Sequence, residues 1–127
     1  MTQLTKNFTR QEFDCKDGTP VPQKYYANVQ EVANNLQALR DHLGVPVVIS
    51  GSGYRTPAHN KKFGGAPKSQ HLTASGADIS SRDYTPKELA AEIEKLIAAG
   101  KMKQGGIGVY KGFVHYDIRG TKARWNG

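Results

Sequence analysis

The stretch from Ser50 to Ser80 places the strongest constraint on what this chain can fold into. It is poor in bulky apolar side chains and rich in glycine, yet dense in groups that do chemistry. His71 and Asp78 stand seven residues apart near its end, and Arg55 lies upstream. We therefore treat this stretch as the segment around which the rest of the chain is organised.

Two helices are expected ahead of this stretch. Residues Thr9 to Glu12 form a capping box, in which side chains satisfy the free N–H groups of a first helical turn. Phe8 and Phe13 flank the box as a hydrophobic staple. A short helix should therefore begin there and end by Gly18.

The longer helix is expected from Pro22 to Leu43, with Gly44 as its stop residue. Its apolar residues recur at three- and four-residue steps and make one stripe, which consists of Tyr25, Val29, Val32, Leu36, Leu39 and Leu43. His42 lies off this stripe in the last turn, so we expect it at the surface.

Strands and helices alternate irregularly through the rest of the chain. Apolar patterning predicts a buried strand at Val45–Ser50 and a second strand at Ala77–Ser80. Helix start signals and glycine stops predict a helical turn from Thr56 to Gly64 and a helix from Thr85 to Gly100. A hairpin of Gly106–Tyr110 and Phe113–Arg119 is expected last. Because no regular strand–helix–strand repeat emerges, the sequence indicates an α+β fold with a small, mainly antiparallel sheet flanked by helices.

Length and composition limit the classes of protein to which this chain can belong. Its 127 residues suit a single domain spanning residues 1–127. No apolar run approaches the roughly 20 residues of a membrane span, and the first residues lack the hydrophobic core of a signal peptide. The single cysteine, Cys15, excludes an internal disulfide. The net charge of +7 favours an anionic partner: nucleic acid, acidic lipid or a cell-wall polymer.

Three side chains in this pattern have the chemistry of a zinc site. Strand alternation places Asp78 on one polar face and sets His115 and Asp117 together on another. If these faces meet in one cleft, the loop that precedes Asp78 delivers His71 to them. Two imidazoles and one carboxylate leave a fourth zinc position for water, whose pKa falls to about 7 on the metal.

Composition and spacing alone leave this metal site open. A single histidine in a small protein is more often a surface or hydrogen-bonded residue than a ligand. The sequence also contains neither HExxH nor CxxC, two spacings typical of zinc proteins. The site therefore needs support beyond the histidine pair.

A set of short motifs resembles one peptidase family over most of the chain. The motifs are SGSGYRTP at Ser50–Pro57, GGAxxSxHL at Gly64–Leu72, ADI at Ala77–Ile79, GIGVY at Gly106–Tyr110, FVHxD at Phe113–Asp117 and KARW at Lys122–Trp125. In combination they resemble the zinc D-Ala-D-Ala carboxypeptidase family, murein peptidases that share the hedgehog/DD-peptidase fold. The compact size is most similar to phage-encoded members.

The resemblance implies a role for each matched residue. His71, Asp78 and His115 would be the ligands of a Zn²⁺ cofactor. Arg55 resembles the family arginine that contacts the carboxylate or acyl oxygen of the substrate, and its planar, permanently charged fork suits that role. Pairing with a structural carboxylate is the alternative for this arginine. The residues expected to bind substrate are Arg55, Ser69 and His59.

Two departures from the family pattern concern the site. The glycine and the alanine that follow the first histidine of the family by three and five residues are replaced by Ala74 and Gly76. Many members carry an acidic residue three positions before the last histidine, where this chain has Gly112. Our candidate for the general base is therefore Asp117, which lies on the same strand face as His115. The alternative role for Asp117 is to orient a metal ligand. His59 is a weaker candidate for the base.

The resemblance thus implies a zinc-dependent peptidoglycan peptidase that acts as a carboxypeptidase or an endopeptidase, in the manner of an endolysin. Its partner would be the peptidoglycan stem peptide, cut next to a D-amino acid. Neither nucleic acid nor a membrane is expected as a partner, and the protein is expected to be a monomer. It would be made in the bacterial cytoplasm and act on the cell wall, released by another factor or carried in a virion.

Two other classes of function stay open. A zinc-containing but catalytically silent cell-wall-binding module is one, because Gly112 replaces the usual acid. A basic nucleic-acid-binding protein is the other. Against the second class, the lysines and arginines are scattered through the chain and no nucleic-acid-reading motif is visible.

Overall fold

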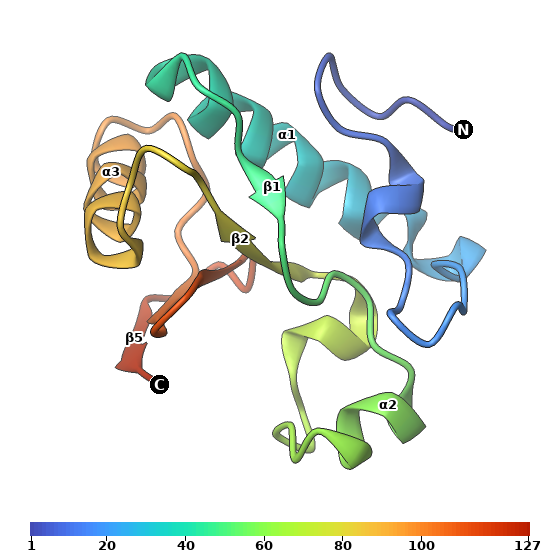
Figure 1. Ribbon diagram of the computed structural model, residues 1–127. Coiled ribbons are helices and arrows are strands. Elements are labelled where there is room, and N and C mark those ends of the chain that lie inside the picture. Colours follow the sequence, from blue (N-terminus) through green and yellow to red (C-terminus); the bar gives the residue numbers. More distant parts are fainter.

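The computed structural model describes residues 1–127 as a five-stranded sheet with helices packed around it (Figure 1). The strands are β1 (Val48–Ile49), β2 (Gly76–Ser80), β3 (Gly106–Val109), β4 (Val114–Asp117) and β5 (Ala123–Asn126). They lie in the order β1-β2-β4-β3-β5, and every neighbouring pair is antiparallel except β3 and β5. The predicted α+β class with a mainly antiparallel sheet is confirmed.

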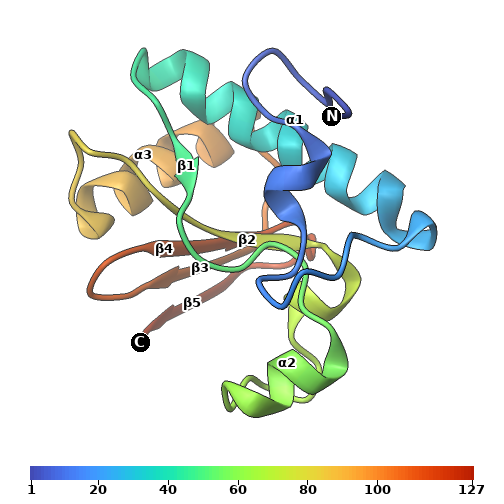
Figure 2. The ribbon, with the colours of Figure 1, turned by 45° about the vertical axis from the view of Figure 1, so that its right-hand side comes forward.

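Two long helices, α1 (Tyr26–Leu43) and α3 (Pro86–Ala98), lie on one side of the sheet (Figure 2). Alternation along the strands turns one set of side chains toward these helices. The fully buried strand residues of this set are Ala77, Ile79, Val114 and Tyr116. They belong, with the apolar stripes of the helices and buried residues of the N-terminal segment and loops, to a core of 23 buried residues. The opposite face of the sheet is left for polar groups.

Helix α1 follows the predicted pattern closely. It begins after a single 3-10 turn, η2 (Gln23–Tyr25), and ends at Gly44, whose φ of 70° is a left-handed conformation that suits glycine. The four central members of its stripe are completely buried: Val29, Val32, Leu36 and Leu39. His42 lies at the surface as expected, where its Nε2 contacts the Glu92 carboxylate at 2.9 Å.

The N-terminal helix is shorter than predicted. It is one 3-10 turn, η1 (Arg10–Phe13), and the chain is already extended at Asp14. The Asp14 carboxylate accepts the Val21 N–H at 3.1 Å, which folds the following residues into a loop rather than a helix. The expected staple is present, because the rings of Phe8 and Phe13 pack at 6.5 Å.

The prediction of a buried strand at Val45–Ser50 is wrong in extent and in burial. Strand β1 has only two residues, it pairs with β2 alone, and it forms an edge of the sheet. Val48 is 49% exposed as a result. A run of β-branched residues indicates a strand but does not distinguish an edge strand from a central one.

A small lobe projects from one end of the sheet, on the side away from α1 (Figures 1 and 2). It contains α2 (Pro57–Lys62), which lies where a helical turn was predicted and is capped by Thr56, and the 3-10 turn η3 (Gln70–Thr73). None of the helices is both long enough and apolar enough to cross a lipid bilayer.

Candidate metal centre

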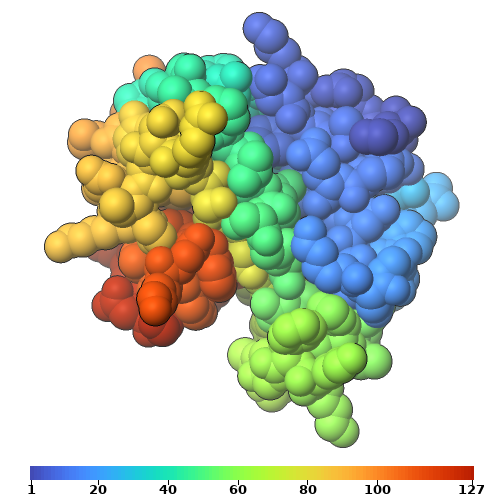
Figure 3. Space-filling view, in the orientation of Figure 1, coloured from blue at the N-terminus to red at the C-terminus, as the bar shows by residue number.

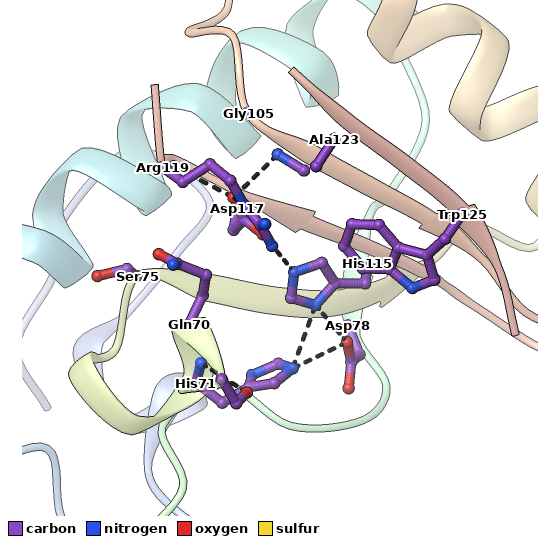
Figure 4. A network of polar contacts seen from close by, with 12 residues as sticks. Gln70, His71, Ser75, Asp78, Gly105, His115, Asp117, Arg119, Ala123 and Trp125 are labelled. Atoms are coloured by element: carbon purple, nitrogen blue, oxygen red, sulfur yellow. Dashed lines mark hydrogen bonds and ion pairs between the residues drawn. The ribbon is translucent and has the colours of Figure 1, made fainter. Parts of the chain in front are cut away.

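The pairing of the strands sets four residues in one row across the polar face of the sheet. Asp78 of β2 lies opposite His115 of β4, His115 lies opposite Gly108 of β3, and Gly108 lies opposite Trp125 of β5. Gly108 has no side chain, and a Cβ there would come within 2.4 Å of the Trp125 Nε1. The indole therefore reaches across β3 to lie beside His115, with the two ring centroids 5.3 Å apart (Figure 4).

His71 enters this row from the small lobe. Ser69 caps η3 by accepting the His71 backbone N–H at 3.2 Å, which fixes where the turn begins. The His71 ring then places Nδ1 2.7 Å from the carbonyl oxygen of Gly53. Because a carbonyl can only accept, Nδ1 carries the hydrogen and Nε2 presents a lone pair toward Asp78 and His115.

Three ligand-type atoms meet at the centre of the site (Figure 4). His71 Nε2, Asp78 Oδ1 and His115 Nδ1 form a triangle in which each of the three separations is 3.2 Å. All three residues are buried. In tetrahedral zinc coordination, bonds of about 2.0–2.1 Å separate the ligand atoms by roughly 3.3 Å. The donor set and its spacing therefore fit a zinc ion.

The electrostatics of the triangle favour a positive charge at its centre. Burial alone would raise the pKa of the Asp78 carboxyl. When protons rather than a metal ion occupy the centre, hydrogen bonds from the protonated rings of His115 and His71 outweigh burial and hold that pKa well below its usual range. Burial alone would lower the pKa of the His115 imidazole, but Asp117 and Asp78 raise it on balance. Three close lone pairs repel one another unless a cation, either a proton or a metal ion, lies between them.

Asp117 lies behind His115 rather than in front of it. It is completely buried, and its Oδ2 accepts the N–H of His115 Nε2 at 2.7 Å, on the side of the ring away from the triangle. Arg119 donates to both carboxylate oxygens, and the Gly106 N–H donates to Oδ1 at 2.9 Å. Burial would raise the pKa of Asp117, but these hydrogen bonds outweigh it and keep the pKa low. This position fits the orientation of a ligand and does not fit a base in the cleft.

The triangle lies in a cleft of about 500 Å³ between the small lobe and the β3–β4 hairpin with β5. Figure 3 shows the surface hollowed between the α2 region and the C-terminal strands. The lining residues are Arg55, Phe63–Ala66, Lys68–His71, Asp78, Tyr110, Phe113, His115, Arg119 and Trp125. Asp78 is the only carboxylate among them, so the cleft is cationic apart from the centre itself.

Two of the three expected substrate-binding residues line this cleft. Arg55 does so while its Nη2 lies 3.6 Å from the Asp78 Oδ2, and Ser69 does so from the start of η3. His59 does not line the cleft, because it lies on α2 with its ring packed on Phe63 at a centroid distance of 4.5 Å.

Sequence reasoning missed the aromatic wall of the cleft. Trp125 donates its Nε1–H to the Tyr110 hydroxyl oxygen at 2.8 Å, and the Tyr110 ring stacks on Phe113 at 4.6 Å. Trp125, an aromatic residue near the C-terminus, was the sequence feature that could have indicated this wall. Its position beside the cleft follows only from the parallel pairing of β5 with β3.

Comparison with known families agrees with this geometry. A family model described as Peptidase M15 matches residues 3–117, a range that contains all three residues of the triangle. No curated protein matches the chain.

We expect His71→Ala and His115→Ala each to lower the metal content by one zinc ion per chain, because each change removes one corner of the triangle. His42→Ala is the matched control, since His42 lies at the surface against Glu92. Elemental analysis of the dialysed proteins measures the zinc, and circular dichroism checks the fold. Full zinc content in both variants would exclude the triangle as the site.

Proposed function

This chain belongs to the peptidase M15 family of zinc metallopeptidases, and on that premise we propose that it hydrolyses an amide bond next to a D-amino acid in peptidoglycan. The substrate is the stem peptide or its cross-link, cut by carboxypeptidase or endopeptidase action as in an endolysin. The single observation that carries the proposal is the triangle of three lone-pair atoms, 3.2 Å apart, at the base of an open cleft.

The residues that hold zinc in this proposal are His71, Asp78 and His115. Each histidine is fixed in the right tautomer by what its other ring nitrogen contacts, the Gly53 carbonyl in one case and Asp117 in the other. A zinc ion so held supplies Lewis acidity, which polarises a carbonyl oxygen and activates water.

Arg55 positions the substrate in this proposal. Its Nε donates to Ser52 Oγ at 2.8 Å and its Nη1 to Asn60 Oδ1 at 3.2 Å, so the guanidinium is held rigidly at the edge of the triangle. Its side chain is 18% exposed and faces the cleft. A planar fork fixed in this way can bind a peptide carboxylate or carbonyl beside the reacting bond.

The proposal extends to how the chain acts as a whole. We take residues 1–127 as one catalytic domain that works as a monomer at the cell wall, with neither nucleic acid nor a membrane as partner. The net charge of +7 draws it to an anionic wall. Lys68 adds positive charge to the cleft itself, which favours a peptide that carries carboxylates.

One observation favours a second candidate, a zinc-containing module that binds the wall without cutting it. No lining residue other than Asp78 carries a carboxylate, and Gly112 stands in open space where many relatives carry an acid. Proton transfer from the attacking water then has no dedicated acidic side chain.

Digestion of purified peptidoglycan distinguishes the two candidates. The zinc-loaded chain should release fragments whose new termini, identified by mass spectrometry, adjoin a D-amino acid. His115→Ala and a chelated sample should release none. Sedimentation of the chain with the wall, without any new termini, would replace the peptidase with the binding module.

We expect Arg55→Lys to retain zinc but to lose most of the activity. Lysine keeps the positive charge but cannot donate to Ser52 and Asn60 while also presenting a two-pronged face to the substrate. Lys68→Arg is the matched control, because it keeps a charge on the cleft wall. Turnover of Arg55→Lys at the parent rate would show that the arginine acts only through its charge.

We expect Asp117→Asn to weaken zinc binding by about 10–100-fold, with activity restored by excess metal, because the residue orients His115. A general base would behave differently: zinc affinity would hold while kcat fell by roughly 10²–10⁴. Measuring zinc affinity and kcat on this one variant separates the two roles. If kcat falls and excess zinc does not restore it, Asp117 acts as the general base rather than through the orientation of His115.

A further inference from the structure

A second cluster of metal-ligating side chains lies away from the cleft. Cys15 and Asp17 follow η1, and His59 comes from α2. Their ligand atoms, one from each side chain, all lie within 4.8 Å of one another. Cys15 is buried, Asp17 is exposed and His59 is half-buried, so the cluster has a closed side and a side open to solvent. None of the three residues lines the cleft.

The backbone holds these groups in place. A tight turn from Cys15 to Thr19 is closed by the Cys15 N–H, which donates to the Thr19 carbonyl at 2.9 Å. The Asp17 carboxylate accepts the Thr19 N–H at 2.9 Å and the Thr56 hydroxyl at 2.9 Å. The same hydroxyl oxygen caps α2 by accepting the His59 N–H at 3.1 Å. Thr56 therefore ties the turn to the helix at this cluster.

The side chains are in suitable states to bind a cation. Hydrogen bonds from Thr19 hold the pKa of the Asp17 carboxyl below its usual range, so it is ionised. Each of its oxygens has two lone pairs and retains one after the bonds to Thr19 and Thr56. Neither ring nitrogen of His59 forms a hydrogen bond within the protein. Cys15 is the only cysteine and forms no disulfide.

We propose that Cys15, Asp17 and His59 form a second metal site, which binds a thiophilic divalent cation such as zinc. Thiolate, imidazole and carboxylate together suit zinc and cobalt, whereas magnesium and calcium select oxygen ligands alone. Tetrahedral coordination separates such ligand atoms by roughly 3.3–3.8 Å. The cluster therefore has to close by about 1.5 Å at most when it binds the cation. Water takes the fourth position on the open side.

An ion at this site would link the Cys15–Thr19 turn to the small lobe that contains α2 and forms one side of the cleft. Helix α2 also carries Asn60, whose Oδ1 accepts a hydrogen bond from Arg55 at 3.2 Å. Binding to the folded chain alone stabilises it by mass action. The thermal midpoint should accordingly rise with metal concentration beyond what the cleft site accounts for.

Cobalt titration of the metal-free chain tests the site through a signal that the cleft cannot give. The triangle of His71, Asp78 and His115 contains no sulfur, so a cobalt–thiolate charge-transfer band in the near ultraviolet reports Cys15 alone. We expect the intensity of this band to stop rising when one cobalt ion per chain occupies the second site. Added zinc should displace the cobalt and remove the band. His71→Ala should keep the band in full.

Variants make the assignment specific. His59→Gln and Asp17→Asn should each weaken cobalt binding at the thiolate by at least tenfold, and Cys15→Ser should abolish the band. His42→Gln is the matched control for loss of an imidazole. Should the serine variant fail to fold, the other two changes carry the test, because neither side chain is in the core. No band at saturating cobalt, or a band unchanged in both His59→Gln and Asp17→Asn, would overturn the proposal. Neither result depends on peptidoglycan cleavage.

Discussion

The close approach of three buried lone pairs is the constraint on which the rest of the site depends. His71 Nε2, Asp78 Oδ1 and His115 Nδ1 are 3.2 Å from one another, and such a set is repulsive without a cation. The surrounding protein keeps the triangle from relaxing by holding each ring through its other nitrogen. The Gly53 carbonyl holds His71, and the Asp117 carboxylate, itself held by Arg119, holds His115. The site is therefore built to receive positive charge rather than to avoid it.

Sheet register makes this arrangement compatible with a stable core. Asp78 pairs directly with His115, and the residues next to them, Ala77 and Val114, turn into the core against the long helices. A slip of one residue in either strand would turn Asp78 or His115 toward the helices and the apolar side chains away from them, so one pairing fixes both stability and the site. Because Gly108 has no side chain, Trp125 of β5 can lie across it at the end of the row formed by Asp78 and His115.

The sequence predicts the local features of this structure well and its long-range features poorly. The stripe of α1, both capping boxes and the shared face of His115 and Asp117 follow from spacing, because helix and strand periodicity fix which side chains share a side. The direction of the Asp117 carboxylate does not follow, because it depends on Arg119 and the Gly106 N–H. Strand β5 was missed because it pairs in parallel with a strand that is not its neighbour in the sequence. The edge position of β1 is likewise a property of the whole sheet.

The N-terminal segment, which no motif assigned to the site, takes part in holding it. The Phe13 carbonyl accepts the Tyr54 N–H at 2.7 Å, so the backbone of η1 lies directly against the loop that follows β1. This approach requires glycine at position 53, since a Cβ there would lie 2.8 Å from the Phe13 Cα and carbonyl oxygen. The same Gly53 presents its carbonyl to His71 Nδ1. The tautomer of His71, and with it the lone pair of Nε2 in the triangle, is thereby set from the first turn of the chain.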